Sequence, residues 1–192
     1  FGSLYIADEV HTGLGRTGKL WAVEQWGEKP DILITGKGLS GGLYPVSAAV
    51  LSNQVGHWLA EDGWGYVSTF GGAQPGCAVG LKALEICAAS ATLQNANAMA
   101  GHLRRGLDDI RKRHPFLRGI NQCGLVMGLE FDDPQGGPLM SGALYKQGLW
   151  AMFASFDRSV LQFKAGLLVD QAYCDEGLQR LEDAIRTATG AR

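Results

Sequence analysis

The first half of the chain alternates short apolar runs with glycine-rich loops. Residues 4–7, 31–35 and 47–51 are apolar runs of strand length, so the pattern predicts three buried strands. Residues 13–18 form a glycine-rich loop after the first run, and residues 20–26 fit a short helix before the second. Because a crossover separates the first two strands, we expect them to pair in parallel.

The second half contains longer periodic segments. Residues 74–91 have helical spacing, and Pro75 suits the first turn of a helix. Residues 97–114 are amphipathic, and Pro115 ends this predicted helix. A final helix is predicted over residues 175–188. The inward positions are Met99, Leu103, Leu107 and Ile110 in the middle helix and Leu178, Leu181 and Ile185 in the last.

Strand patterns lie between the last two of these helices. Residues 125–131 alternate between apolar side chains and small or polar ones, which predicts a half-buried strand. Residues 150–153 and 160–163 fit two further short strands, and Gly136-Gly137-Pro138 fits a loop. The change in pattern near the middle of the chain predicts two parts.

We expect an α/β fold in which residues 1–95 belong to a mostly parallel α/β domain and residues 96–192 form a smaller α+β domain. Hydrophobic residues make up 46% of the chain and charged residues 19%, which is enough for a real core. The net charge of −2 gives no reason to expect a nucleic acid or an anionic membrane as partner, and no apolar run has the length of a bilayer span. The four cysteines lack metal-ligand spacing, so we expect no metal site and the reduced, mostly buried thiols of a cytoplasmic protein.

Two residues carry candidate chemistry, and each follows a predicted strand. Asp8 comes directly after the first apolar run, and Lys37 follows the second within a glycine-rich segment. Ligands of open α/β sheets bind at the carboxyl ends of the strands. A lysine and an aspartate at this place suit pyridoxal phosphate (PLP): the lysine forms a Schiff base with the cofactor aldehyde, and the aspartate keeps the pyridine nitrogen protonated. Taken singly, Asp8 also fits a helix or loop cap, and Lys37 a solvated loop lysine.

Further residues extend this candidate site. Val10 is two positions after Asp8, so in a continued strand both side chains share a face and Val10 would lie against a cofactor ring. His11 follows and could donate a hydrogen bond to the ring hydroxyl. Ser68 and Thr69 precede the helix predicted from residue 74, where hydroxyls and free N–H groups suit either a phosphate or a simple N-cap and turn.

Two nucleotide-binding motifs fit poorly. Residues 13–18 match G-x-G-x-x-G, but the next helix is short, Pro30 interrupts, and the next strand ends without the acidic residue that such folds require. Gly36-Lys37 suggests a P-loop, which would need glycine at position 31 and serine or threonine at position 38; the chain has Asp31 and Gly38.

The segments 6–18, 36–47 and 68–72 together make the sequence resemble the class III aminotransferases, a PLP fold-type I family that includes ornithine and acetylornithine aminotransferases. The resemblance implies that Lys37 is the Schiff-base lysine, that Asp8 pairs with the pyridinium, and that Val10 packs under the ring. It also implies that His11 stands where the family usually has glutamine. Thr69 would bind the cofactor phosphate of a neighbouring subunit, so a homodimer is expected.

Three departures from the family pattern limit what the resemblance implies. Family subunits are about twice as long, and the opening Phe1-Gly2-Ser3 resembles the interior of a protein, so we expect the chain to be the C-terminal half of a subunit and inactive alone. Ala73-Gln74-Pro75 replaces the usual asparagine-proline. Gln162 aligns with the position where many members have an arginine for the substrate α-carboxylate.

The expected function is PLP-dependent transfer of an amino group between a small-molecule amine or amino acid donor and a keto or aldehyde acceptor. Another PLP chemistry on the same scaffold, such as that of an aminomutase, decarboxylase or phospho-lyase, is one alternative. A nucleotide-binding, non-catalytic module that reuses the glycine loops is another.

Overall fold

The computed structural model describes residues 2–190, and the chain divides into two compact units between Leu93 and Gln94. The first unit contains a three-stranded sheet in the order β1 (Ile6–Asp8), β2 (Ile32–Thr35) and β3 (Ala48–Leu51). β1 and β2 pair in parallel, as the crossover predicted.

β3 runs antiparallel to β2, so this sheet is mixed rather than mostly parallel. Thr35 pairs with Ala48, which shows that the connection leaves β2 and returns to the same edge of the sheet. A chain that returns to the edge it left can only add an antiparallel strand.

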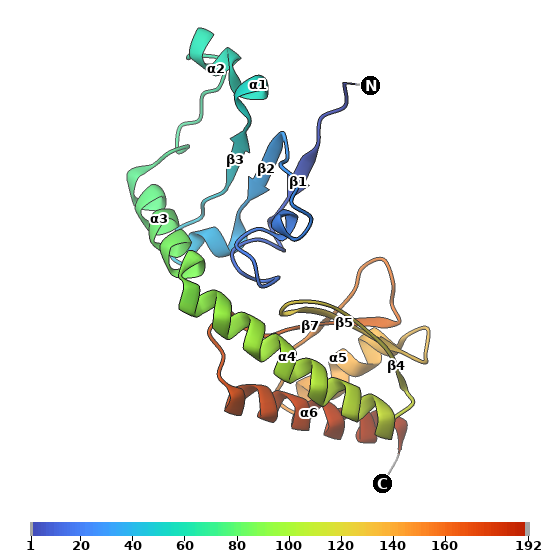
Figure 1. The fold of residues 1–192 in the computed structure, drawn as a ribbon. Helices are drawn as coiled ribbons and strands as arrows, with labels where there is room; N and C mark the ends of the chain where they lie inside the picture. The colour runs from blue at the N-terminus through green and yellow to red at the C-terminus, as the bar shows by residue number, and fades with distance from the viewer. Residues whose placement is uncertain (1, 191–192) are drawn as a thin grey trace. The chain divides into compact units, whose positions relative to one another are not determined.

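Short helices and one long helix complete the first unit (Figure 1). Leu39 is buried in η2, and α3 packs on η2 so closely that a Cβ on Gly80 would lie 3.7 Å from the Leu39 side chain. The helices are η1 (Ala22–Gln25), η2 (Lys37–Ser40), α1 (Asn53–Gly56), α2 (Trp58–Glu61) and α3 (Gln74–Ala88).

Two predicted helix boundaries are wrong. α3 ends at Ala88 rather than at residue 91, and α4 (Ser90–Arg113) begins seven residues before the predicted start at residue 97. Ala89 between them has extended backbone (φ −58°, ψ 133°), and the two helices bend by 59° there. No glycine or proline marks this break, so the sequence carried no local signal for it. Among the described helices none is long and apolar enough alone to cross a membrane, although this bent pair passes by length and composition.

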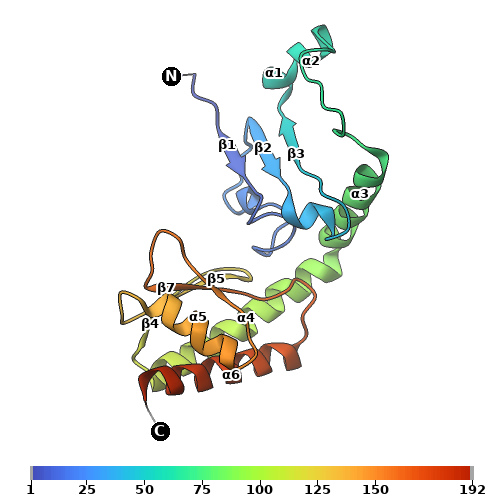
Figure 2. The ribbon, with the colours of Figure 1, turned by 180° about the vertical axis from the view of Figure 1, so that it is seen from behind.

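The second unit is a four-stranded antiparallel sheet with helices on one side (Figures 1 and 2). Its strands follow the order β4 (Leu117–Cys123), β5 (Val126–Phe131), β7 (Val160–Lys164), β6 (Met152–Phe153). The helices are α4, α5 (Gly136–Lys146) and α6 (Gln171–Thr189). The predicted strands are therefore present, and β4 is an addition. The final helix is present as well, but α6 begins four residues before the predicted start at residue 175.

Alternation along the strands and helical periodicity build one core in this unit. Every second residue of β5 is buried, as predicted for residues 125–131. The inward residues predicted for the middle and last helices join the same core, with Leu107, Leu181 and Ile185 fully buried.

The predicted loop at residues 136–138 is wrong, because these residues begin α5. Gly136 and Gly137 are buried, and a Cβ on Gly137 would lie 2.6 Å from the Val160 carbonyl oxygen. The glycines allow a close approach of backbones instead of a turn.

The expectation of mostly buried thiols is also wrong. All four cysteines are free, but only Cys174 is buried, while Cys77 and Cys123 are exposed.

Candidate active site at the ends of two parallel strands

Asp8 and Lys37 lie at the same edge of the first unit's sheet. Asp8 is the last residue of β1 and pairs with Ile34 of β2. The Glu9 N–H donates to the Ile34 carbonyl oxygen at 2.8 Å and continues the pairing by one residue. β2 ends at Thr35, and Lys37 opens η2.

Lys37 adopts an uncommon backbone conformation. Its φ is 45°, in the left-handed region that side chains other than glycine rarely occupy. Gly36 before it is buried, and a Cβ there would lie 3.3 Å from the Ser47 Cβ and 3.9 Å from a Val10 methyl. The segment is thus held between its neighbours, with Val10 beside it.

The Lys37 side chain contacts His11. The ammonium or amine nitrogen Nζ of Lys37 is hydrogen-bonded to Nε2 of His11, and both residues are exposed. Residues from two separate segments therefore bring a primary amine and an imidazole together.

Asp8 is exposed, and its Oδ1 accepts a hydrogen bond from the Val10 N–H at 3.1 Å. This contact between a side chain and the backbone two residues on starts a turn. The strand ends at Asp8, so strand alternation does not place Asp8 and Val10 on one face.

Glu9 anchors this site, although the sequence pattern did not indicate it. It is only 3% exposed, and its carboxylate accepts from the Val23 N–H at 2.8 Å and from the Thr12 hydroxyl at 2.6 Å. The carboxylate thereby fixes the loop that carries His11. Glu9 follows the last residue of β1 and lies between exposed Asp8 and half-buried Val10, so no strand periodicity in the sequence marks its burial.

The glycine-rich loop after β1 leads into η1, a helix of four residues. A dinucleotide motif needs a long helix at this place, so the structure agrees with the rejection of that motif. Arg16 of the loop is half-buried, which lowers the pKa of its guanidinium, and it lies near Cys87 of α3, whose thiol pKa is raised by burial.

Ser68 and Thr69 lie in the segment before α3, and both are exposed. The Ser68 hydroxyl oxygen accepts a hydrogen bond from the Gly71 N–H at 3.0 Å. Figures 1 and 2 show this segment on the β3 side of the sheet, while Asp8 is on β1 at the other edge. A phosphate role for these hydroxyls stays a prediction.

Gln162 belongs to β7 of the second unit. Its neighbours Leu161 and Phe163 point into the core, whereas Gln162 is on the opposite face. Its side-chain amide donates to the Phe153 carbonyl oxygen at 3.1 Å, and Lys164 Nζ donates to its Oε1 at 2.5 Å. Gln162 and Lys164 therefore share one face of β7.

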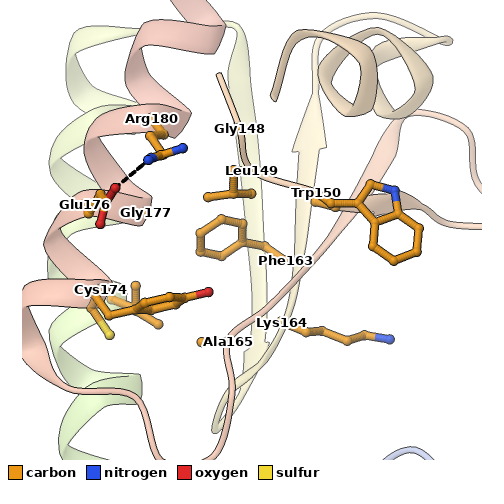
Figure 3. A pocket seen from close by; sticks show the side chains of 13 residues that line it. Gly148, Leu149, Trp150, Phe163, Lys164, Ala165, Cys174, Glu176, Gly177 and Arg180 are labelled. Carbon is orange, nitrogen blue, oxygen red and sulfur yellow. Dashed lines mark hydrogen bonds and ion pairs between the residues drawn. The ribbon is translucent and has the colours of Figure 1, made fainter. Parts of the chain in front are cut away.

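A hollow of about 240 Å³ in the second unit contains none of the predicted site residues. Figure 3 shows Leu149, Phe163 and Cys174 on its apolar wall, with the Glu176–Arg180 ion pair at one side. Among the described residues, no group of three or more histidines, cysteines or carboxylates is placed to hold a metal ion.

Comparison with known proteins decides the family. A sequence model of the family described as Aminotransferase class-III matches residues 2–185. The chain belongs to the class III aminotransferase family. It is 39% identical to an uncharacterized aminotransferase of Archaeoglobus fulgidus, over 100% of this chain and 45% of the relative. It is 36% identical to an acetylornithine aminotransferase of Caldanaerobacter subterraneus, over 95% of this chain and 44% of the relative.

Solved structures of the family share the fold. The acetylornithine aminotransferase of Elizabethkingia anophelis is 29% identical, with a TM-score of 0.86 over 96% of this chain and 48% of that one. The ornithine aminotransferase of Plasmodium yoelii is 28% identical, with a TM-score of 0.85 over the same shares. The chain thus spans less than half the length of these relatives. The covered shares give lengths alone, and the expected position in the C-terminal half of a subunit stays a prediction.

Proposed function

We propose that the full-length protein transfers an amino group between an amine or amino acid donor and a keto or aldehyde acceptor, using PLP. The observation that supports this most is the position of Asp8 and Lys37 at the carboxyl ends of two neighbouring parallel strands. Family membership supports the same chemistry. In this proposal the first unit is part of a PLP-binding large domain, and the second is the small domain.

The residues at this edge fit PLP. Lys37 offers an exposed primary amine on a segment held by its neighbours, and Asp8 offers a carboxylate with Oδ1 already oriented by the Val10 N–H. When bound, PLP would withdraw electrons from the substrate carbon that bears the amino group. Lys37 would hold the cofactor covalently through Nζ, and Val10 and His11 would border its ring.

The roles of the two charged residues follow from their chemistry. A carboxylate beside a ring nitrogen favours the protonated, cationic nitrogen, because an opposite charge nearby stabilises the charged form. Lys37 is a base of suitable reach for moving a proton at the substrate carbon once its amine is released. Asp8 therefore stabilises charge, and Lys37 binds and then carries a proton.

The donor class is a finer part of the proposal. An arginine binds a carboxylate through two parallel charge-assisted hydrogen bonds. Gln162 cannot supply that charge, and it is already bonded to Phe153 and Lys164. We therefore favour a donor whose reacting amine is distant from an α-carboxylate or lacks one.

The assembly completes the proposal. Thr69 is exposed in the segment before α3, which supports a role toward a second copy of the chain. The proposed protein is a cytoplasmic homodimer in which Ser68 and Thr69 bind the phosphate of the neighbouring cofactor.

A half-reaction tests the function and separates it from other PLP chemistry. Full-length protein loaded with PLP is mixed with terminal amines and with α-amino acids, without an acceptor. Amino-group transfer predicts loss of the visible cofactor absorption in one turnover, its recovery on adding a keto acid, and a higher kcat/KM for terminal amines. A decarboxylase, mutase or lyase would turn over without an acceptor, which would contradict the proposal.

A further inference from the structure

The contact between His11 and Lys37 has a chemical consequence beyond cofactor placement. We propose that His11 is the proton acceptor of the Lys37 ε-ammonium group and so prepares Lys37 for covalent bonding. This inference deepens the proposed function and rests on it, because it presupposes that Lys37 reacts with an aldehyde.

The hydrogen bond between the two nitrogens can hold only one proton. A charged ammonium has donors and no acceptor, so Lys37 can donate to His11 only if Nε2 carries a lone pair. In the reverse arrangement, Nε2–H donates to a neutral amine. The contact thus favours states in which the imidazole and the amine are not both protonated, and it gives the proton a direct path between them.

The other titratable groups of these segments have other partners. The Asp8 carboxylate binds the Val10 N–H, and the Glu9 carboxylate binds Thr12 and the Val23 N–H. The charged groups of α3, which packs on η2, include Lys82 and Glu85, which pair with each other at 2.9 Å. Arg16, in the loop after β1, lies near Cys87 of α3. Of these groups, His11 is the one hydrogen-bonded to Lys37 Nζ.

The proton balance is complete within the proposed step. One proton passes from Lys37 Nζ to His11 Nε2, and the freed lone pair of Nζ forms a bond to the aldehyde carbon. A second proton moves from Nζ to the aldehyde oxygen, and His11 then donates the proton on Nε2 to that oxygen. The oxygen leaves as water, and His11 is neutral again.

The rate of covalent loading measures this role without any turnover. PLP-free full-length protein is mixed with PLP, and the borohydride-stable adduct at Lys37 is followed with time. We expect His11→Gln, which keeps a hydrogen-bonding side chain but cannot carry the proton, and His11→Ala to load at least about tenfold more slowly. Free imidazole should restore the rate of His11→Ala, and more basic imidazoles should restore it more. His57→Ala, which removes another exposed histidine, should load like the wild type.

The outcomes separate the two claims. Absence of an adduct at Lys37 in the wild type contradicts the proposed function. A normal adduct at equal rates in wild type and His11→Gln, or no rescue by imidazole, contradicts only the inference.

A second measurement needs no cofactor. In PLP-free protein, NMR titration of the His11 ring should show that Lys37→Met makes His11 protonate at a higher pH, because a neighbouring positive charge is removed. An unchanged titration of His11 would contradict the proposed proton transfer from Lys37 to His11.

Discussion

Lys37 has a backbone conformation that costs a residue other than glycine on the order of 1 kcal/mol or more. Glycine occupies the positions on both sides of it, so the chain could have placed the strained angle at either neighbour. The strain falls instead on the residue whose side chain contacts His11. At the residue scale, this places the conformational cost where the proposed chemistry needs a fixed amine.

The charge of Asp8 should matter far more than its shape. We predict that Asp8→Asn in the full-length protein lowers turnover by about two orders of magnitude or more and leaves PLP bound, because the charge that favours a protonated ring nitrogen is lost. Turnover and bound PLP per subunit are the measurements. Asp62→Asn is a matched control, since Asp62 accepts from the Trp64 N–H at 3.0 Å in the same kind of turn. Similar turnover in the two variants would remove Asp8 from the mechanism.

The sequence allowed prediction of Asp8 and Lys37 because each follows an apolar strand, and parallel strand ends meet at one edge. It did not allow prediction of the His11–Lys37 contact or the Glu9 anchor. Both depend on how the loop after β1 folds back on itself, and the hydrogen bonds from Thr12 and the Val23 N–H that decide this leave no periodic pattern.

At the scale of elements, the start of α5 depends on a close approach. A Cβ at Gly137 would meet the carbonyl oxygens of Arg158 and Val160 at 2.8 and 2.6 Å. Backbone atoms cannot move aside like the end of a flexible side chain. The approach therefore explains why two glycines stand in the first turn of a helix.

Substitution by alanine should affect stability differently at two glycines of α5. We predict that Gly137→Ala lowers the free energy of unfolding by about 1–3 kcal/mol through overpacking. Gly142→Ala, in the same helix with no atom within 4 Å of the added Cβ, should be neutral or raise it by up to about 1 kcal/mol. Urea unfolding of both variants gives the comparison. Equal effects would show that α5 does not pack as described.

Glu182 joins α6 to the end of α4. Its carboxylate binds Arg113 at 2.8 and 3.0 Å, His114 at 2.9 Å and Arg186 at 3.0 Å. The hydrogen bonds from Arg113 are the largest cause that lowers the pKa of Glu182 to about 2. Because the folded-state pKa lies below the unfolded one, the carboxylate contributes stability above about pH 4.5, and this contribution is lost as the pH falls toward 2.

We predict that Glu182→Gln lowers the free energy of unfolding by roughly 2–3 kcal/mol at pH 7. The difference from wild type should shrink as the pH falls from about 4.5 toward 2, where the wild-type carboxylate also becomes neutral. Asp183→Asn, at a more exposed position of the same helix, should change stability by about 0.5 kcal/mol or less. If the difference in unfolding free energy between wild type and Glu182→Gln did not depend on pH, the lowered pKa of Glu182 would be contradicted.

The elements themselves were largely predictable. Alternation along β5 and the apolar stripes of α4 and α6 are strong periodic signals, and these elements form the core. The helical start at Gly136 was not predictable, because it depends on a close approach to residues 158–160. The break at Ala89 carries no glycine or proline. β4 was missed because a register shift between Leu117 and Gly119 interrupts its alternation.

At the scale of the whole molecule, the two units differ in how they bury apolar side chains. The second unit has one contiguous core of leucine, isoleucine, methionine and phenylalanine. In the first unit large apolar side chains remain exposed, including Ile6 and Val50 on the strands and Tyr5 just before β1. The proposed dimer would bury part of this exposed apolar surface, so the first unit should be tested in the full-length protein.

The homodimer proposal predicts a selective loss of cofactor. We expect Thr69→Val in the full-length protein to weaken PLP binding about tenfold or more, since a hydrogen bond to a charged phosphate is worth roughly 1.5–3 kcal/mol. Tyr66→Phe removes another exposed hydroxyl from the same segment and should leave PLP binding unchanged. Equilibrium binding of PLP, with sedimentation to verify the dimer, measures both. Equal affinities in the two variants would argue against a phosphate site at Thr69.

The proposed function depends first on the attachment of PLP to Lys37. The most direct measurement is borohydride reduction of the PLP-loaded full-length protein, followed by peptide mapping. We expect about one phosphopyridoxyl group per subunit on Lys37, and none in Lys37→Ala. A label on another lysine, or no label on the wild type, would contradict it.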